Sequence, residues 1–425
     1  MPAVDASSEK FNHPKGLSTL FFTEMWERFS YYGMRALLVL FMTATIADGG
    51  MGLDDVTATS IYGLYTASVY LAALPGGWIA DRLIGAHRTV WYGGIVIMCG
   101  HFILAIPAVP TFFIGLIFVA LGTGLLKPNV SAIVGKLYPQ GGAACDAGYT
   151  IFYVGINVGA MLGPLVCSAL GESARFGWHY GFAVAGFGML FGLMQFHFFK
   201  DRLGTAGLYP AHMEENALHK EAPRHGWLMV NVGIAIIVLV TALTLGGVIQ
   251  VNALAVAKFS AGLIALVTLL FFAYLLLLGG LETIEKKRVL VIVALVIGSS
   301  VFWSGFEQTG SSLNLFAERY TDRMVGSFEI PAGWFLSINA ACILIFSPFI
   351  AALWINLAKR NLNPSIPLKF ALGLLQLGLG FIVIMVAAKL VANGNLVAPG
   401  WLVMTYVLHT TAELCLSPVG LSAIS

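Results

Sequence analysis

Apolar stretches recur from one end of this 425-residue chain to the other, and each is long enough, at about 20 residues, to cross a bilayer as a helix. Hydrophobic residues make up 58% of the sequence and charged residues only 10%, whereas a typical soluble domain has roughly 25% charged residues. So much apolar surface cannot be hidden in one soluble core. A membrane β-barrel would instead show short segments of alternating polarity. The pattern therefore predicts an all-α polytopic membrane protein.

The apolar segments predict twelve membrane-spanning helices. They cover residues 17–43, 56–81, 88–107, 110–138, 146–171, 179–199, 226–249, 255–280, 288–318, 332–357, 368–391 and 399–425. Placing the N-terminus in the cytoplasm puts most of the 23 lysine and arginine residues into cytoplasmic loops, in agreement with the positive-inside rule. We therefore expect a multi-pass protein of the plasma membrane with a cytoplasmic N-terminus. The charged first span does not read as a cleavable signal peptide.

The longest polar stretch, near residues 200–225, divides the chain. A weak repeat between "PGGWIADRLIGAHR" and "PFIAALWINLAKR" is offset by more than one six-helix half, which indicates an inserted helix pair. We expect an N-terminal six-helix bundle over 1–200, a connection with the inserted pair over 201–285 and a C-terminal bundle over 286–425. Only four helices follow the inserted pair, and the sequence stops inside an apolar run. We therefore expect the last two core helices to be missing from this chain.

One face of the first predicted helix carries charges that are costly in lipid. In "TEMWERFSYYGMR" (23–35), a turn of 3.6 residues aligns five side chains: Glu24, Glu27, Arg28, Tyr31 and Arg35. A charge at the bilayer centre costs about 2.5–3.5 kcal/mol on insertion scales, so such residues usually face a cavity and serve function. The alternative is a structural cluster of salt bridges that holds helices together.

Three further spans carry one charge each: Lys127 in "GTGLLKPN", Glu307 in "FWSGFEQTGSS" and Glu413 in "TAELCLSPVG". Each charge lies beside Gly, Pro or Ser, which allow broken or closely packed helices around a cavity. The structural-cluster interpretation would need a separate explanation for each of them. We therefore favour a polar cavity in the membrane.

Several classes of function find no support in the sequence. There is no G-x-x-x-x-G-K-[ST] motif, so we expect no ATP hydrolysis, and no G-x-S-x-G or H-E-x-x-H motif to supply a nucleophile or a metal site. The five cysteines form no C-x-x-C pair. A formal charge of +2 is too small to indicate a nucleic-acid partner. We expect no enzyme activity, no metal and no cofactor.

Taken together, the motifs resemble those of the proton-dependent oligopeptide transporters, a branch of the major facilitator superfamily. Glu24-x-x-Glu27-Arg28-Phe29-x-Tyr31-Tyr32-Gly33 is similar to the family's first-span signature, and "GGWIADRLIGAHRT" resembles the superfamily's loop between spans two and three. "FYVGINVGA", "FWSGFEQTGSS" and "ELCLSPVG" resemble further family motifs in the same order. The resemblance implies two six-helix bundles plus two inserted helices. It also implies a symporter of the bacterial inner membrane that uses the proton gradient to import di- and tripeptides by alternating access.

The resemblance also implies roles for individual residues. Arg28, Arg35 and Lys127 would receive the peptide carboxylate, for which Arg offers bidentate contacts. Asn157, Asn339 and Glu413 would hold the peptide's amino group, and Glu307 would pair with Arg35 to close the outer side. The remaining pocket residues would be Tyr31, Tyr32, Tyr70, Trp303 and Ser417. Ordinary packing stays an alternative for each tyrosine.

Proton coupling would fall on carboxylates, because the second span lacks the histidine that animal members of the family carry. The coupling set is Glu24, Glu27, Arg28, Lys127 and Glu307. We expect His409 to be a core histidine. Two rival functions remain: the same fold transporting another solute such as nitrate or a drug, and a peptide-sensing receptor that does not translocate its ligand.

Overall fold

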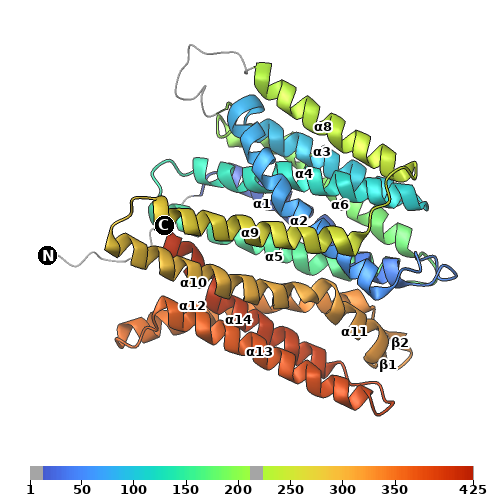
Figure 1. The fold of residues 1–425 in the computed structure, drawn as a ribbon. Coiled ribbons are helices and arrows are strands. Elements are labelled where there is room, and N and C mark those ends of the chain that lie inside the picture. Colours follow the sequence, from blue (N-terminus) through green and yellow to red (C-terminus); the bar gives the residue numbers. More distant parts are fainter. Residues whose placement is uncertain (1–12, 211–223, 425) are drawn as a thin grey trace.

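The computed structural model describes residues 13–210 and 224–424, which are folded mainly into long helices (Figure 1). The first part contains α1 (Gly16–Thr43), α2 (Asp55–Ile79), a π-helical turn (Ala80–Ile84), α3 (Ala86–Leu104), α4 (Val109–Lys136), α5 (Gly142–Gly171), α6 (Trp178–Phe199) and a 3₁₀ turn (Lys200–Leu203). The middle contains α8 (Arg224–Leu245) and α9 (Ala253–Leu278). The last part contains α10 (Thr283–Phe306), a 3₁₀ turn (Glu307–Gly310), α11 (Ser312–Tyr320), β1 (Met324–Val325), β2 (Phe328–Glu329), a 3₁₀ turn (Ala332–Leu336), α12 (Ser337–Lys359), α13 (Ile366–Val391) and α14 (Gly400–Ile424).

Helix covers every one of the expected spans, which confirms the helical membrane fold. Among the described residues, eight helical segments are long and apolar enough to cross a membrane by length and composition. α1 is not one of them because Glu24, Glu27, Arg28 and Arg35 all fall within it. The charges on this face are therefore what keep α1 from meeting the criteria for a membrane span.

The span expected at 288–318 is present, within Thr283–Tyr320, but it is not one continuous helix. α10 ends at Phe306, a 3₁₀ turn follows, and Ser311 leaves helical geometry at φ −127° and ψ −99° before α11 begins. Gly310 lies so close to the hydroxyl of Tyr62 and to Arg35 that a Cβ would overlap them. The break therefore lets the chain approach α1 and α2 and places Glu307 beside Arg35. A short antiparallel hairpin, β1–β2, was also not expected from the sequence.

The first six helices pack together, with α3 against α4 and with α1 mainly against α5 and α6. Two glycines of α5 explain the close approach. A Cβ on Gly159 would overlap the carbonyl oxygen of Met25, and a Cβ on Gly163 would overlap that of Phe29. Small residues at a four-residue spacing are a common way to bring two membrane helices together. This contact fixes the charged face of α1 within the molecule.

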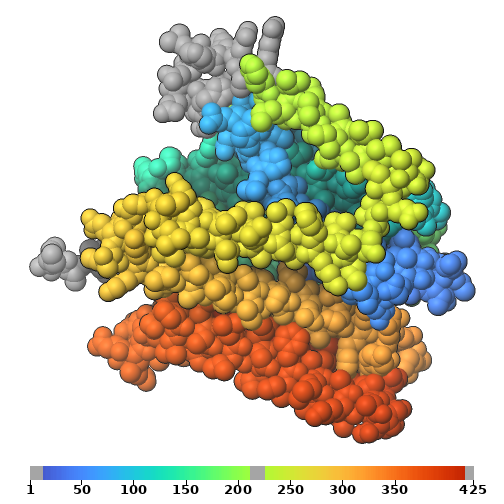
Figure 2. Space-filling view, viewed as in Figure 1, coloured from blue at the N-terminus to red at the C-terminus, as the bar shows by residue number. Residues whose placement is uncertain are grey.

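The helices after α9 form a second packed group, with α13 against both α10 and α14 and with α12 against α14. α9 packs on α2 and α10 and has no buried residue. The apolar window of α8 has none either. Figure 2 shows α9 lying across the visible surface of the molecule. We call the end of the molecule where α1 begins the N-side, at the left of Figure 1, and the opposite end, which carries β1–β2, the far side.

Candidate functional site

The charged face of α1 is buried as expected. The exposed fraction is 1% for Glu24, 0% for Glu27, 5% for Arg28 and 7% for Arg35. Nε of Arg28 donates a 2.7 Å hydrogen bond to Oε1 of Glu24 and lies 3.2 Å from Oε2 of Glu27. All three residues belong to one helix, so their ion pairs do not join two helices. This geometry argues against a purely structural cluster of salt bridges.

Three oxygens of this cluster have no hydrogen-bond partner among the described residues: Oε2 of Glu24 and both oxygens of Glu27. An ionised carboxylate that is buried without such partners is costly. A bound proton or a nearby cation removes that cost. Arg28, at 3.2 Å from Oε2 of Glu27, is such a cation.

Lys127, the fourth residue of the expected coupling set, lies on α4. Its Nζ is 4.5 Å from the ring centroid of Tyr70 on α2, a cation–π contact. Among the described residues it makes no ion pair within 4.0 Å. Tyr70 is 56% exposed, so the pair borders open space. Lys127 therefore forms no ion pair with Glu24 or Glu27 in this state.

Arg35 joins the two groups of helices. Its Nε donates a 2.5 Å hydrogen bond to the hydroxyl of Tyr62 on α2, and its Nη2 forms an ion pair with Glu307 in the turn after α10. The ion pair between Arg35 and Glu307 is the one the family resemblance implies. Tyr62 was not in the expected set, although it lies at the centre of this contact.

The structure also places Asn339 of α12 beside Glu413 of α14. Nδ2 of Asn339 lies 3.1 Å from Oε2 of Glu413 and 3.0 Å from Oγ1 of Thr410. Asn157 of α5 is buried, and its Nδ2 donates to the carbonyl of Tyr153 within the same helix. These contacts bring two of the three expected amine-binding residues together and give Asn157 a partner within its own helix.

The expected pocket aromatics differ in burial. Tyr31 is buried and its ring stacks at 6.4 Å on that of Tyr65, so its packing role is clear. Tyr32 lies partly exposed between Tyr31 and Arg35. Trp303 is 39% exposed and stands edge-on to the neighbouring phenylalanines of α10. The side chain of Ser417 lies outside the described residues. His409 is buried at 1% against Phe381, as expected of a core histidine.

A second carboxylate contact between the two helix groups was not expected at all. Glu172, which follows α5, accepts hydrogen bonds from the backbone N–H groups of Ala332 (2.6 Å) and Gly333 (2.9 Å) at the start of the turn before α12. Burial raises the pKa of the Glu172 carboxyl to about 6, although the two N–H donors and nearby Arg323 act in the opposite direction. Arg323 itself is paired with Glu329 at 2.7 Å.

The other polar contacts between the two groups lie at the same end of the molecule. Asn314 donates to the carbonyl of Ala36, Trp334 to that of Leu165 and Ser337 to that of Met161, while Arg319 pairs with both oxygens of Asp55. These residues come from the far-side portions of their helices. The two groups are thus closed against each other on the far side in this state.

A family model, related sequences and solved structures all point to the same group of proteins. The model of the POT family matches residues 87–425. Peptide transporter YePEPT of Yersinia enterocolitica is 44% identical over 98% of this chain and 82% of that protein. The Di-/tripeptide transporter of Lactococcus lactis subsp. cremoris is 35% identical over 97% of this chain and 83% of its own length. A crystal structure of peptide transporter POT in complex with alafosfalin matches with a TM-score of 0.86 and 42% identity, covering 98% of this chain and 83% of that one.

Proposed function

We propose that this chain, which belongs to the POT family of proton-dependent oligopeptide transporters, is a proton-coupled symporter that imports di- and tripeptides. The relatives named above are a peptide transporter and a di-/tripeptide transporter, and one similar structure holds a thioalcohol-conjugated peptide. A transporter of this class needs no catalytic residue and no cofactor. Its energy source is the proton gradient across the bacterial inner membrane.

The observation that carries the substrate class is the separation of charge between the two helix groups. Arg28 and Lys127 lie in the first group, and the Asn339–Glu413 pair lies in the second. A cationic end attracts the C-terminal carboxylate of a peptide, and a carboxylate with an amide carbonyl attracts its amino group. A short zwitterion such as a dipeptide satisfies both ends at once. A simple anion would leave Glu413 without a cationic partner.

The far-side contacts support alternating access. We assign the N-side to the cytoplasm, because the positive-inside rule places most Lys and Arg residues there. The far side then faces outward, and the contacts of Arg35 and Glu172 hold it closed in this state. Peptide release on the cytoplasmic side would let the helix groups rock about the site and reopen the far side.

Nitrate or a drug as cargo is the nearest rival, and uptake competition separates the two. We expect unlabelled dialanine to abolish uptake of a labelled dipeptide into liposomes that contain the protein, whereas nitrate at the same concentration leaves uptake unchanged. The same assay tests the receptor alternative, because a receptor would bind the dipeptide without carrying it inside. Inhibition by nitrate alone, or binding without uptake, would contradict the proposal.

Closure of the far side is expected to depend on pH through Glu172. The pKa of about 6 in the closed state lies above the ordinary value of 4.5, so the closed state binds this proton more tightly than a state with an exposed Glu172. Acid therefore favours closure. Proton linkage predicts that the ratio of closed to open molecules rises roughly five- to tenfold as pH falls from 7 to 5.

The measurement is the distance distribution between spin labels on Ile46 and Leu396, two exposed far-side loop residues from the two helix groups. Ile46 and Leu396 are each replaced by cysteine to carry a label. The variant lacks Cys99 and Cys145, the two cysteines that are not buried. Glu172→Gln should lose the pH dependence of closure that comes from the Glu172 carboxyl. Glu329→Gln, which alters a carboxylate on the hairpin beside the same site, should keep it. An unchanged pH response in Glu172→Gln would refute the assignment.

A further inference from the structure

The Asn339–Glu413 pair is held by a third side chain, Thr410, which lies outside the expected set. Thr410 is completely buried on α14, three residues before Glu413. Its Oγ1 donates a 2.7 Å hydrogen bond to the carbonyl of Tyr406 and lies 3.0 Å from Nδ2 of Asn339. Asn339 itself is partly exposed. A substrate can therefore contact Asn339, whereas Thr410 can act on the substrate only through Asn339.

The bond to Tyr406 decides how Thr410 can bind Asn339. A hydroxyl group has one hydrogen, and a threonine in a helix can give it to the carbonyl four residues earlier. Because that hydrogen is used for Tyr406, Oγ1 of Thr410 can only accept a hydrogen bond from Asn339. The NH₂ group of the Asn339 amide must then face α14, and its carbonyl oxygen, Oδ1, faces away from Thr410.

The second hydrogen of this NH₂ group is given to Glu413. Nδ2 of Asn339 lies 3.1 Å from Oε2 of Glu413, so both of its hydrogens have acceptors on α14. Oδ1 of Asn339 and Oε1 of Glu413 accept no hydrogen bond from the described residues. An ammonium group has three donors and no acceptor. These two oxygens suit it, whereas a turned amide would present N–H donors to it.

Glu413 alone does not fix the amide in this orientation. An ionised carboxylate only accepts hydrogen bonds, but a protonated carboxyl group also donates one. A protonated Glu413 can therefore bind either end of the Asn339 amide. Thr410 can bind only the NH₂ end, so it keeps Oδ1 in place whether or not Glu413 carries a proton.

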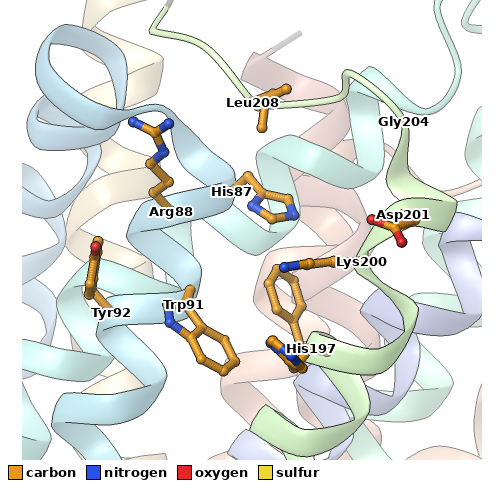
Figure 3. A pocket seen from close by; sticks show the side chains of 10 residues that line it. His87, Arg88, Trp91, Tyr92, His197, Lys200, Asp201, Gly204 and Leu208 are labelled. Carbon is orange, nitrogen blue, oxygen red and sulfur yellow. The ribbon is translucent and has the colours of Figure 1, made fainter.

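A hollow elsewhere in the molecule offers no comparable site for an amino group. It has a volume of about 470 Å³, lies between α3 and α6 and is lined by residues of the first helix group (Figure 3). Its lining contains one carboxylate, Asp201, and two cations, Arg88 and Lys200. Like charges repel, so this hollow disfavours an ammonium group. The Asn339–Glu413 pair is therefore the better place for the amino end of a peptide.

We propose that Thr410 is a positioning residue that makes the site select peptides with a free amino group, because it holds Oδ1 of Asn339 toward the substrate. This role rests on the proposed function, in which Asn339 and Glu413 bind the amino end of the peptide. Thr410→Val replaces the hydroxyl by a methyl group, which removes the acceptor for Nδ2 and lets the amide turn. The free amino group then loses an acceptor. An N-acetylated peptide carries no ammonium group and is little affected.

The test is competition binding to the purified protein with three peptides: dialanine, N-acetylated dialanine and dialanine amidated at its C-terminus. Thr410→Val should lower the preference for dialanine over the N-acetylated form roughly three- to tenfold, the range set by the net contribution of one hydrogen bond. Its preference for dialanine over the amidated form should not change, because the cationic end of the site is intact. A general structural defect would alter both preferences.

Three further variants at this position and beside it act as controls. Thr410→Ser keeps the hydroxyl and should keep the preference, and loss of the preference in this variant would contradict the role of the hydroxyl. Thr410→Ala also lacks the hydroxyl and should act as Thr410→Val, so the test does not depend on the folding of one variant. Thr411→Val is the matched control, because Oγ1 of Thr411 bonds to the carbonyl of Val407 in its own helix. It should bind all three peptides as the unaltered protein does.

Glu413→Gln separates the role of Thr410 from the proposed function on which it rests. It should lower the preference for the free amino group, because the ammonium group loses a carboxylate. If Glu413→Gln does so while Thr410→Val and Thr410→Ala keep the preference of the unaltered protein, the role of Thr410 is refuted and the proposed function stands. If Glu413→Gln leaves the preference unchanged as well, the amino end binds elsewhere, and the assignment of the amine site fails with it.

Discussion

Glu27→Gln is expected to abolish peptide accumulation driven by a pH gradient. Gln has the shape of a neutral carboxyl group but cannot take up and release a proton. Both oxygens of Glu27 lack hydrogen-bond partners, and Arg28 is within 3.2 Å, so the proton of Glu27 is coupled to the charge of the site. Glu24→Gln should act in the same way, because two carboxylates this close titrate as one unit. The measurement is uphill dipeptide uptake into liposomes with an imposed gradient.

Peptide binding and peptide-for-peptide exchange should survive in both variants, since neither requires net proton movement. Retained affinity distinguishes a coupling defect from misfolding. Glu318→Gln, which changes an exposed glutamate on α11, is the matched control and should accumulate peptide normally. Normal accumulation by Glu24→Gln and Glu27→Gln would move the proton site elsewhere, with Glu307 and Glu413 as the next candidates.

Arg35→Ala and Lys127→Ala are expected to weaken dipeptide binding far more than binding of the same peptide amidated at its C-terminus. The reason is that each removes a cation from the end of the site that receives the carboxylate. Losing a hydrogen bond to a charged group costs about 1.5–3 kcal/mol, which corresponds to roughly 10- to 150-fold in affinity. Competition binding with the two peptides measures the difference.

The control for this pair is Lys389→Ala, which removes a lysine from the last turn of α13 on the far side. It should leave both affinities unchanged. Arg35→Ala also removes the contact with Glu307 and so loosens the far side, whereas Lys127→Ala leaves that contact in place. Equal losses for the free and amidated peptides in Lys127→Ala would show that Lys127 does not bind the carboxylate.

The helices and the buried face of α1 could be predicted because hydropathy and helical periodicity are local signals. The break after Phe306 could not, since the flanking apolar residues fit a continuous helix equally well. What decides the break is the approach of Gly310 to Tyr62 and Arg35, residues more than two hundred positions earlier in the chain. The same tertiary contact brings Glu307 to Arg35.

In the site too, some residues could be predicted from local sequence signals and others depend on tertiary contacts. Charged residues inside apolar spans are conspicuous in the sequence, and the ion pair of Arg35 with Glu307 was expected from the family resemblance. Tyr62 carries no charge and lies among other tyrosines of α2, so no sequence signal distinguishes it from them. Glu172 follows the end of a helix, where a charge looks like an ordinary loop residue. Its partners are backbone N–H groups, which leave no signal in the sequence.

The central claim is that inward proton flow drives peptide uptake, and dipeptide accumulation in proteoliposomes tests it most directly. A potential of about 100 mV and one pH unit together supply about 3.7 kcal/mol per proton, enough for roughly 500-fold accumulation. The account predicts that the labelled dipeptide rises well above its external concentration when the outside is acidic, and that a protonophore collapses the accumulated pool. Uptake that stops at equal concentrations on both sides, with no response to the gradient, would contradict it.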